Sequence, residues 1–297
     1  MSMGFLEYVN FESGSMELIH HGSTSARALK RSKITYKSAD PSVTSVEKTS
    51  LLENTENKDL PFTPTYWDIA SVGSTGRDML VYGEHKYDAK YKFESPSDDD
   101  WDNGKVYTSF SCSPMPKTSA PNGKAKDVSE SMIIDIYLAG RFNFLSDNKW
   151  GSLTIQSHYS NIHHLRERAF SKVTGVFKNH LREAREASFN ITLKTILGDH
   201  EFHLKENGDN GHYADDRLSL ADIHLANLIH YFQAFPWGKM AEDAFRKCES
   251  VWRVKENVDR VPSLAAWRAT EEFKMYEKNS VTWYSRLAVP GDDSCEE

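Results

Sequence analysis

The chain has few cysteines and no excess of positive charge. Its 297 residues include three cysteines, Cys112, Cys248 and Cys295, and no CxxC pair, so a disulfide framework and a dithiol redox centre are not expected. Lys and Arg total 36 against 43 Asp and Glu, a formal charge of -7, which leaves no surplus to neutralise a phosphate backbone. We therefore expect a reducing, cytoplasmic environment and no nucleic-acid partner.

Long apolar runs and metal-binding motifs are also absent from the sequence. No segment approaches the stretch of about 20 apolar residues that a membrane-spanning helix needs. The 12 histidines include two adjacent pairs, but the sequence has no HExxH motif and no Cys/His group at metal spacing. We therefore expect neither a membrane span nor a bound metal.

The length predicts about two compact domains with ample core. Residues 1–60 are rich in Ser, Thr, Lys and Glu without a sustained period, which predicts a mostly disordered extension. Residues 61–147 mix strand and helix patterns, and residues 148–290 carry helical patterns only. The acidic residues 291–297 are expected to form a frayed tail.

The segment after residue 61 predicts a βαβ unit. Residues 65–70 alternate and are aromatic, as in a half-buried strand, and the polar residues 71–76 suit the start of a helix from Arg77. Residues 87–93 alternate again and predict a second strand. A hairpin turn is expected at Asn122-Gly123, although residues 117–127 lack the apolar alternation of well-formed strands.

Helices are predicted through the rest of the chain. One starts at Ser129, with Ile133, Ile136, Tyr137 and Leu138 on one side. Apolar residues near helical spacing predict two or more long helices over residues 153–204, and further helices over residues 241–254 and 263–276. Between these, Ser219 and Asp222 have the spacing of a reciprocal N-terminal cap. The helix that follows them is apolar nearly all round, so it should occupy the centre of a bundle.

Five of these segments together resemble the cytosolic glutathione transferase superfamily, in particular its tyrosine-type members. Thr65-Tyr66-Trp67-Asp68-Ile69 resembles the first strand of the family, Arg77 falls at a matching helix position, and Pro116 resembles the family's cis-proline. The most specific matches are Glu130-Ser131-Met132-Ile133-Ile134-Asp135-Ile136-Tyr137-Leu138 and Ser219-Leu220-Ala221-Asp222-Ile223. The resemblance extends from Thr65 to about Leu287. It implies a thioredoxin-like α/β N-terminal domain followed by an all-α helical bundle.

The resemblance also implies an activity and a site. The chain would be a homodimeric glutathione transferase that conjugates glutathione, its co-substrate, to a small hydrophobic electrophile. Tyr66 would donate a hydrogen bond to the glutathione sulfur, and Met115 and Pro116 would hold the cysteinyl backbone. Glu130 and Ser131 would bind the γ-glutamyl end. The glycyl carboxylate would be bound by Trp101 and Lys105.

The residue types suit this chemistry. A thiol reacts as its thiolate, so its pKa must fall from about 8.5 toward neutrality. A hydrogen bond to a charged group contributes roughly 1.5 to 3 kcal/mol, equivalent to about one to two pKa units. One hydroxyl donor therefore suffices to make thiolate a major species.

Some features leave alternatives open. The family's tyrosine-type members commonly carry a basic residue in the loop after the first strand, and the corresponding place here is near Val72. Ser74 is the second candidate for the thiol-activating hydroxyl. The stretch His158 to Ile162, with Arg166, either lines a cleft over the thiol or belongs to the bundle core or a dimer face. The alternative function is a non-catalytic, transferase-like binding or scaffolding protein.

Overall fold

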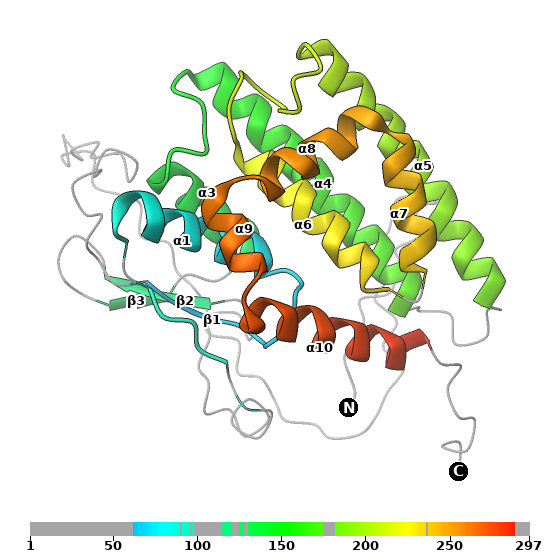
Figure 1. The fold of residues 1–297 in the computed structure, drawn as a ribbon, viewed down its shortest axis with the longest axis horizontal. Coiled ribbons are helices and arrows are strands. Elements are labelled where there is room, and N and C mark those ends of the chain that lie inside the picture. Colours follow the sequence, from blue (N-terminus) through cyan, green and yellow to red (C-terminus); the bar gives the residue numbers. More distant parts are fainter. Residues whose placement is uncertain are drawn as a thin grey trace, which may run out of the picture. The chain divides into compact units, whose positions relative to one another are not determined.

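The structure is a computed structural model of the chain, and it describes residues 62–89, 91–95, 97, 115–119, 125–127, 130–174, 182–235 and 237–288. The expected extension over residues 1–60, the candidates Trp101 and Lys105, the turn at Asn122-Gly123 and the acidic tail lie outside these residues. Within them, the chain has the predicted architecture of an α/β portion followed by an all-α bundle (Figure 1).

Three short strands form an antiparallel sheet in the order β1-β2-β3. Their bounds are Thr63–Thr65 for β1, Met115–Ser119 for β2 and Ala125–Asp127 for β3. The hairpin between β2 and β3 therefore forms in spite of its weak apolar alternation. In the register, Thr65 lies opposite Met115, and Lys117 lies opposite Asp127.

The predicted βαβ unit is present, with different boundaries. Isolated parallel bridges join Phe62 to Tyr91 and Thr65 to Glu94 on either side of α1, Ser74–Tyr87. The first strand ends at Thr65, and the carbonyls of Trp67 and Ile69 that follow accept hydrogen bonds from the side chain of Arg77. The helix begins three residues before Arg77 and includes Tyr87, which the sequence assigned to the second strand.

Helix α3, Ser131–Arg141, lies beside α1 (Figure 1). Its buried face consists of Ile134, Asp135, Leu138 and Ala139. Of the four residues predicted on one apolar side, Leu138 is buried, Ile136 and Tyr137 are partly buried, and Ile133 is exposed, so the prediction was wrong for Ile133. The buried face of α3 therefore includes one carboxyl group, that of Asp135.

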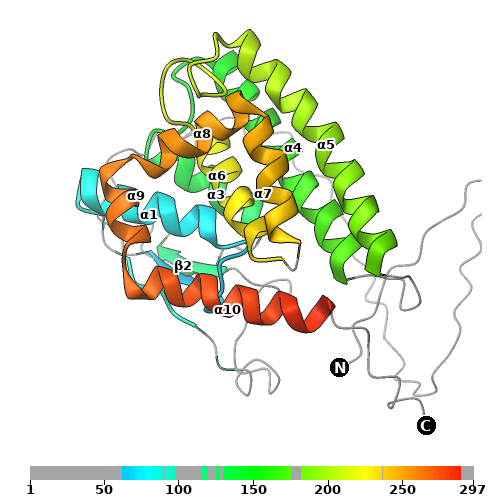
Figure 2. The ribbon, with the colours of Figure 1, turned by 45° about the vertical axis from the view of Figure 1, so that its right-hand side comes forward.

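The bundle is built around one central helix (Figures 1 and 2). Every residue of α6 from Leu220 to Ile229 is buried, which confirms the central position predicted for it. The helices of the bundle are α4, Lys149–Thr174; α5, Arg182–Glu206; α6, Leu220–Gln233; α7, Gly238–Lys247; α8, Glu249–Asp259; α9, Pro262–Arg268; and α10, Glu271–Ala288.

Two of the predicted bundle helices are each divided in two. The helix expected over residues 241–254 is interrupted at Cys248, whose backbone has φ -98° and ψ 87°. The helix expected over residues 263–276 ends at Arg268, and the hydroxyl of Thr270 then accepts a hydrogen bond from the backbone N–H of Phe273 at 3.2 Å. Thr270 thereby satisfies an N–H group in the first turn of α10.

A capping box starts α6, as the sequence predicts. The backbone N–H of Asp222 donates to Ser219 Oγ at 3.4 Å, and the backbone N–H of Ser219 donates to Asp222 Oδ2 at 2.8 Å. The same carboxylate also accepts a hydrogen bond from the backbone N–H of Tyr213 at 2.9 Å. Asp222 thus joins the loop before α6 to the first turn of this helix.

One hydrophobic core runs through both parts of the described chain. Phe62 and Met79 from the α/β part belong to the same buried cluster as Tyr159 and Phe232 from the bundle. A buried polar contact adds to it: Asp78 Oδ2 accepts hydrogen bonds from Arg268 Nη2 at 2.9 Å and from Asn227 Nδ2 at 3.0 Å. Helix α1 is therefore attached to α6 and α9 by charge as well as by apolar packing.

Candidate functional site

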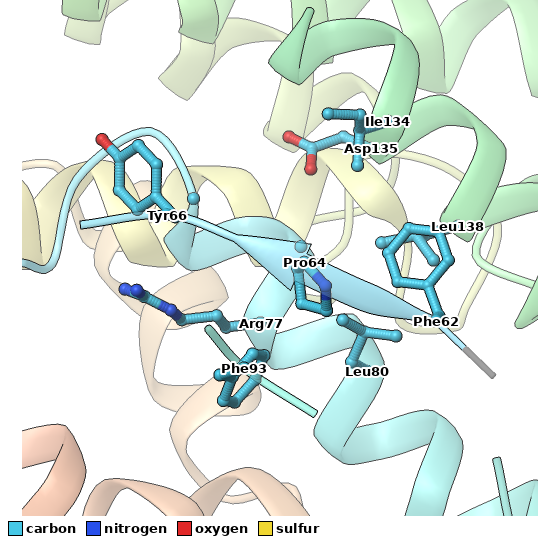
Figure 3. Close-up of a pocket in the computed structure, with 11 residues that line it drawn as sticks. Phe62, Pro64, Tyr66, Arg77, Leu80, Phe93, Ile134, Asp135 and Leu138 are labelled. Carbon is cyan, nitrogen blue, oxygen red and sulfur yellow. The ribbon is translucent and has the colours of Figure 1, made fainter. Parts of the chain in front are cut away.

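Tyr66 is the first residue after β1 and lies on a tightly packed loop. Its side chain is 6% exposed, and its backbone N–H donates to the carbonyl of Glu94 at 2.9 Å. A Cβ on Gly73 would lie 2.6 Å from Tyr66 Cδ1, so only glycine at this position lets the ring pack as it does. Figure 3 shows the hydroxyl pointing away from Phe62, Pro64 and Leu80.

Arg77 holds the loop after Tyr66 in place. Its guanidinium donates to the carbonyls of Trp67 and Ile69, both at 2.7 Å, and its central carbon lies 4.1 Å from the ring centroid of Tyr276 and 5.3 Å from that of Tyr66. Burial lowers the pKa of Arg77. This residue therefore orders the loop around Tyr66 from within α1.

The C-terminal helix α10 binds the same loop through four hydrogen bonds. Asn279 Nδ2 donates to the carbonyl of Asp68 at 2.8 Å, and Ser280 Oγ donates to the carbonyl of Ala70 at 2.9 Å. The hydroxyl of Tyr284 donates to Ser71 Oγ at 3.1 Å. The fourth bond runs from the N–H of Ala70 to the carbonyl of Tyr276, at 3.2 Å. We call this set the α10 latch.

The start of β2 lies next to the strand that leads into Tyr66. Because Met115 is paired with Thr65, and Pro116 with Pro64, their backbone groups run along the edge of β1. Helix α3 packs against β2, so the N-terminal region of α3 belongs to the same part of the fold. The structure therefore brings together elements that carry Tyr66, Met115, Pro116, Glu130 and Ser131.

Glu130 has a backbone conformation that is rare for a side-chain-bearing residue. Its φ is 74° and its ψ is 110°, immediately before α3. Positive φ in a non-glycine residue is uncommon and costs roughly 1 to 3 kcal/mol. The next residues, Ser131 and Met132, occupy the first turn, where the N–H groups of a helix have no intrahelical acceptor. Such a turn suits an anionic group.

Ser74, the second candidate for thiol activation, is the first residue of α1. It is buried, and its backbone N–H donates to the carbonyl of Ser71 at 3.0 Å. Ser71, in the same loop, is engaged by Tyr284 of the α10 latch. Tyr66 and Ser71 thus belong to the loop between β1 and α1, and Ser74 begins the helix that follows it.

A buried polar cluster lies where α3, α4 and α6 meet α1. We call it the junction cluster; its members are Thr75, Asp135, Tyr159, His163, Arg166 and His224. The hydroxyl of Tyr159 donates to Asp135 Oδ2 at 2.8 Å. Burial raises the pKa of Asp135 to about 8, so this carboxyl is protonated at neutral pH.

The histidines of the junction cluster are neutral. Burial lowers the pKa of His163 to about 4 and holds that of His224 well below its usual value. Thr75 Oγ1 lies 2.7 Å from His224 Nδ1, and Arg166 Nη2 lies 3.3 Å from His163 Nε2. The two imidazole rings stack with their centroids 5.5 Å apart. The guanidinium of Arg166 is therefore the only positive charge in the junction cluster.

Sequence reasoning named Arg166 and Tyr159 only as possible cleft or core residues, and it did not assign a role to Asp135. The signal for Asp135 was visible, since it is the one charged residue in the otherwise apolar stretch from Met132 to Leu138. Its contact with Tyr159 was not visible, because the two residues come from different helices.

An apolar cavity beside Tyr66 is too small for a peptide ligand. It measures about 20 Å³ and is lined by Tyr66, Arg77, Asp135 and apolar residues of β1, α1 and α3 (Figure 3). This volume holds about one water molecule. This cavity therefore cannot hold a peptide ligand.

The described residues show neither a metal-binding group nor a membrane-spanning helix. No group of three or more His, Cys, Asp or Glu side chains in this part of the chain is placed to hold a metal ion. Among the helices described, none is long and apolar enough to cross a membrane.

One segment of the chain matches a known family model. Residues 165–271 match the family model for the glutathione S-transferase C-terminal domain. No curated protein sequence matches the chain.

Solved structures give likenesses of fold. Prostaglandin synthase D of Nilaparvata lugens is similar over 71% of this chain and 98% of its own, with 22% identity and a TM-score of 0.58. A monomeric glutathione S-transferase from the hookworm Necator americanus (21% identity) and one specific to the nematode C. elegans (19% identity) are each similar over 71% of this chain and 97% of theirs, with a TM-score of 0.59.

Proposed function

We propose that the chain binds glutathione and conjugates it to small hydrophobic electrophiles, because it has the glutathione transferase fold and its residues 165–271 match the family model for the glutathione S-transferase C-terminal domain. Glutathione is the co-substrate. Tyr66 donates a hydrogen bond to its sulfur and so favours the thiolate.

The observation that carries this proposal is the conformation of Glu130. A strained residue at the start of a helix persists only where the surrounding structure imposes it, and such residues cluster at binding sites. Glu130 precedes α3, and α3 packs against the strand paired with β1. The strain therefore occurs in the part of the fold that leads to Tyr66.

The tripeptide is proposed to lie across these elements. Met115 and Pro116 offer backbone groups to the cysteinyl part, as a strand edge does for an extended peptide. Ser131 and the first-turn N–H groups of α3 receive the γ-glutamyl carboxylate, and the Glu130 carboxylate receives its ammonium group. Trp101 and Lys105 remain the candidates for the glycyl carboxylate.

Two measurements on the full chain test this function. Titration calorimetry with glutathione measures binding, and a conjugation assay with a chlorinated nitroaromatic measures turnover. Binding at millimolar glutathione together with enzyme-dependent conjugate formation is the expected result. The absence of any glutathione binding would refute both the site and the activity.

A non-catalytic binding protein is the second candidate, and one feature of the loop favours it. Tyr66 is nearly buried, and α10 is attached to the loop that follows it. A thiol can reach the phenol only if the loop leaves space beside the hydroxyl. Glutathione binding without turnover would support this candidate.

We also propose a cytoplasmic homodimer. A groove of about 620 Å³ between α4 and α5 is lined mostly by polar residues but also by Trp150, Leu153 and Phe202, and these three residues are 79%, 57% and 59% exposed. Large exposed apolar groups gathered in one groove are typical of an interaction surface. Sedimentation equilibrium of the wild type and of a Trp150→Glu variant measures the oligomeric state; a monomeric wild type would refute the dimer.

A further inference from the structure

Ser71 is more exposed than the other hydroxyl-bearing residues from Tyr66 to Thr75. It is half-buried, whereas Tyr66, Ser74 and Thr75 are 6%, 9% and 1% exposed. The fold covers Ser74, the second candidate for thiol activation, more completely than it covers Ser71. Of the two serines, Ser71 is therefore the one that a ligand reaches more easily.

The backbone of Ser71 is held on both sides. The preceding residue, Ala70, accepts a hydrogen bond from Ser280 Oγ at 2.9 Å and donates its N–H to the carbonyl of Tyr276 at 3.2 Å. The carbonyl of Ser71 itself accepts a hydrogen bond from the backbone N–H of Ser74 at 3.0 Å. A donor on such a fixed backbone is preorganised, so it needs little rearrangement to meet a charge that develops beside it.

The hydrogen bond from Tyr284 leaves the proton of Ser71 for another acceptor. Tyr284 is 0% exposed, so its hydroxyl proton needs an acceptor inside the protein, and Ser71 Oγ accepts it at 3.1 Å. A serine hydroxyl accepts through its oxygen and donates its single proton independently. Because hydrogen bonds in a chain polarise one another, the bond from Tyr284 also makes Ser71 a stronger donor.

The short segment that carries Ser71 also packs against the ring of Tyr66. Gly73 lies between Ser71 and Ser74, and a Cβ on Gly73 would lie 2.6 Å from Tyr66 Cδ1 and 3.1 Å from Tyr66 Cε1. The atom Cε1 is bonded to the carbon that carries the phenol hydroxyl. Residues 71–74 therefore cover the edge of the ring that leads to this hydroxyl.

We propose that helix α10 takes part in thiol activation: Tyr284 orients the hydroxyl of Ser71, and Ser71 is a second hydrogen-bond donor to the glutathione sulfur beside Tyr66. The inference rests on the proposed function, which places the sulfur at Tyr66. The thiol loses its proton to solvent, and both hydroxyls keep theirs and stabilise the thiolate by charge-assisted hydrogen bonds. Ser71 is a catalytic residue in this proposal, and Tyr284 is a positioning residue.

The test measures the pKa of the thiol of bound glutathione, from the ultraviolet absorbance of the thiolate, together with the pH profile of kcat/KM. Ser71→Ala should raise this pKa by about one unit, so kcat/KM falls about 10-fold at low pH and recovers above about pH 8.5, where free thiols ionise. Tyr284→Phe keeps the serine hydroxyl and should give a smaller shift in the same direction. Ser280→Ala, which removes one bond of the α10 latch but neither donor, is the matched control and should leave the thiol pKa unchanged.

The outcomes separate this inference from the proposed function. If Ser71→Ala binds glutathione with the wild-type thiol pKa, or loses kcat/KM equally at every pH, Ser71 is not a donor to the sulfur. A shift in Ser71→Ala without any shift in Tyr284→Phe would overturn the role of α10. If the wild type binds no glutathione, the proposed function itself has failed. Should Ser71→Ala not fold, Tyr284→Phe and Ser280→Ala make the same comparison from α10, and equal thiol pKa values in the two would overturn the proposal.

Discussion

Tyr66 owes its position to Gly73, to Arg77 and to a backbone hydrogen bond with Glu94. Gly73 provides the space for the ring, and Arg77 holds the two carbonyls that follow it. The hydroxyl is thereby kept on the side away from the small cavity (Figure 3). Gly73 and Arg77 thus fix the direction in which the hydroxyl of Tyr66 points.

Removal of that donor should reduce chemistry more than binding. In Tyr66→Phe we expect conjugation to fall by about 10- to 100-fold, because a hydrogen bond to a charged group contributes roughly 1.5 to 3 kcal/mol. The pH profile of kcat/KM should move to higher pH as the thiol pKa rises. Tyr82→Phe, which loses a hydroxyl contacted by Lys86 on the exposed side of α1, is the control. If Tyr66→Phe keeps full turnover, Ser74→Ala is the next variant to measure.

Asp135 makes stability depend on pH in a defined direction. Its pKa in the folded state is raised to about 8 by burial, whereas an unfolded Asp titrates near 4. The carboxyl therefore stabilises the fold fully below about pH 4, and this contribution is lost as the pH rises toward 8.

Asp135→Asn keeps the shape and the acceptor for Tyr159 without a titrating group. Relative to the wild type, the variant should gain free energy of unfolding as the pH rises from 5 to 8, by more than about 1.4 kcal/mol, the equivalent of one pKa unit. Urea unfolding at several pH values measures the difference. A constant difference across this range would mean that Asp135 is ionised in the folded protein.

At the scale of single elements, the start of α6 offers a graded test. Ser219→Ala removes one cap and should cost about 1 kcal/mol of unfolding free energy. Asp222→Ala removes the acceptor for the backbone N–H groups of both Ser219 and Tyr213, so it should cost more. Equal losses in chemical denaturation would indicate that the loop before α6 contributes nothing through Asp222.

The α10 latch should control the mobility of the loop after Tyr66. In Ser280→Ala and Asn279→Ala, the loop loses one hydrogen bond each, and each bond contributes about 0.5 to 1.5 kcal/mol. Amide hydrogen exchange at residues 68–71 should become faster in both variants. Thr282→Ala, on the exposed side of α10, should leave the loop unaffected; if it accelerates exchange equally, the effect belongs to the helix as a whole and not to the latch.

Sequence patterns located the elements better than their ends. The run from Leu220 to Ile229 was recognisable as central because it is apolar all round, and the Ser219 cap because it is local. The end of β1 has no local signal, and the loop after it is held by Arg77, eleven residues after Tyr66. The break at Cys248 also lacks a local signal, such as proline or glycine.

In the candidate site, too, local motifs were predictable and contacts between distant segments were not. Tyr66, Ser74, Met115, Pro116, Glu130 and Ser131 were selected by short motifs, and the structure places their elements together, while their roles stay predictions. The junction cluster joins residues from α1, α3, α4 and α6, so each member has an unremarkable sequence neighbourhood. The division of the chain at residue 147 also remains a prediction, since the described core crosses it.

At the scale of the whole molecule, buried histidines should make the fold sensitive to acid. Burial lowers the pKa of His158, His163 and His200 to about 4, whereas an unfolded histidine titrates near 6.5. The unfolded state thus binds more protons below that pH, and stability is lost as the pH falls from about 6.5 toward 4.

We expect a loss of about 1 kcal/mol for each of these histidines between pH 7 and 5.5. Thermal unfolding measured at several pH values and at fixed ionic strength reports this loss of stability. His163→Gln should weaken the dependence on pH, whereas His164→Gln, an exposed neighbour on α4, should leave it unchanged. A melting temperature that stays constant from pH 7 to 5 would show that water reaches these rings.

The contact of Asp78 with Arg268 and Asn227 bears on what can be cut out of this chain. A fragment restricted to residues 165–271 would retain the guanidinium and the amide but would lack the carboxylate of α1 that both bind. The stretch recognisable by family therefore loses a buried ionic contact when it is separated from α1. Truncations meant for expression should keep α1, so that Arg268 and Asn227 retain their shared acceptor.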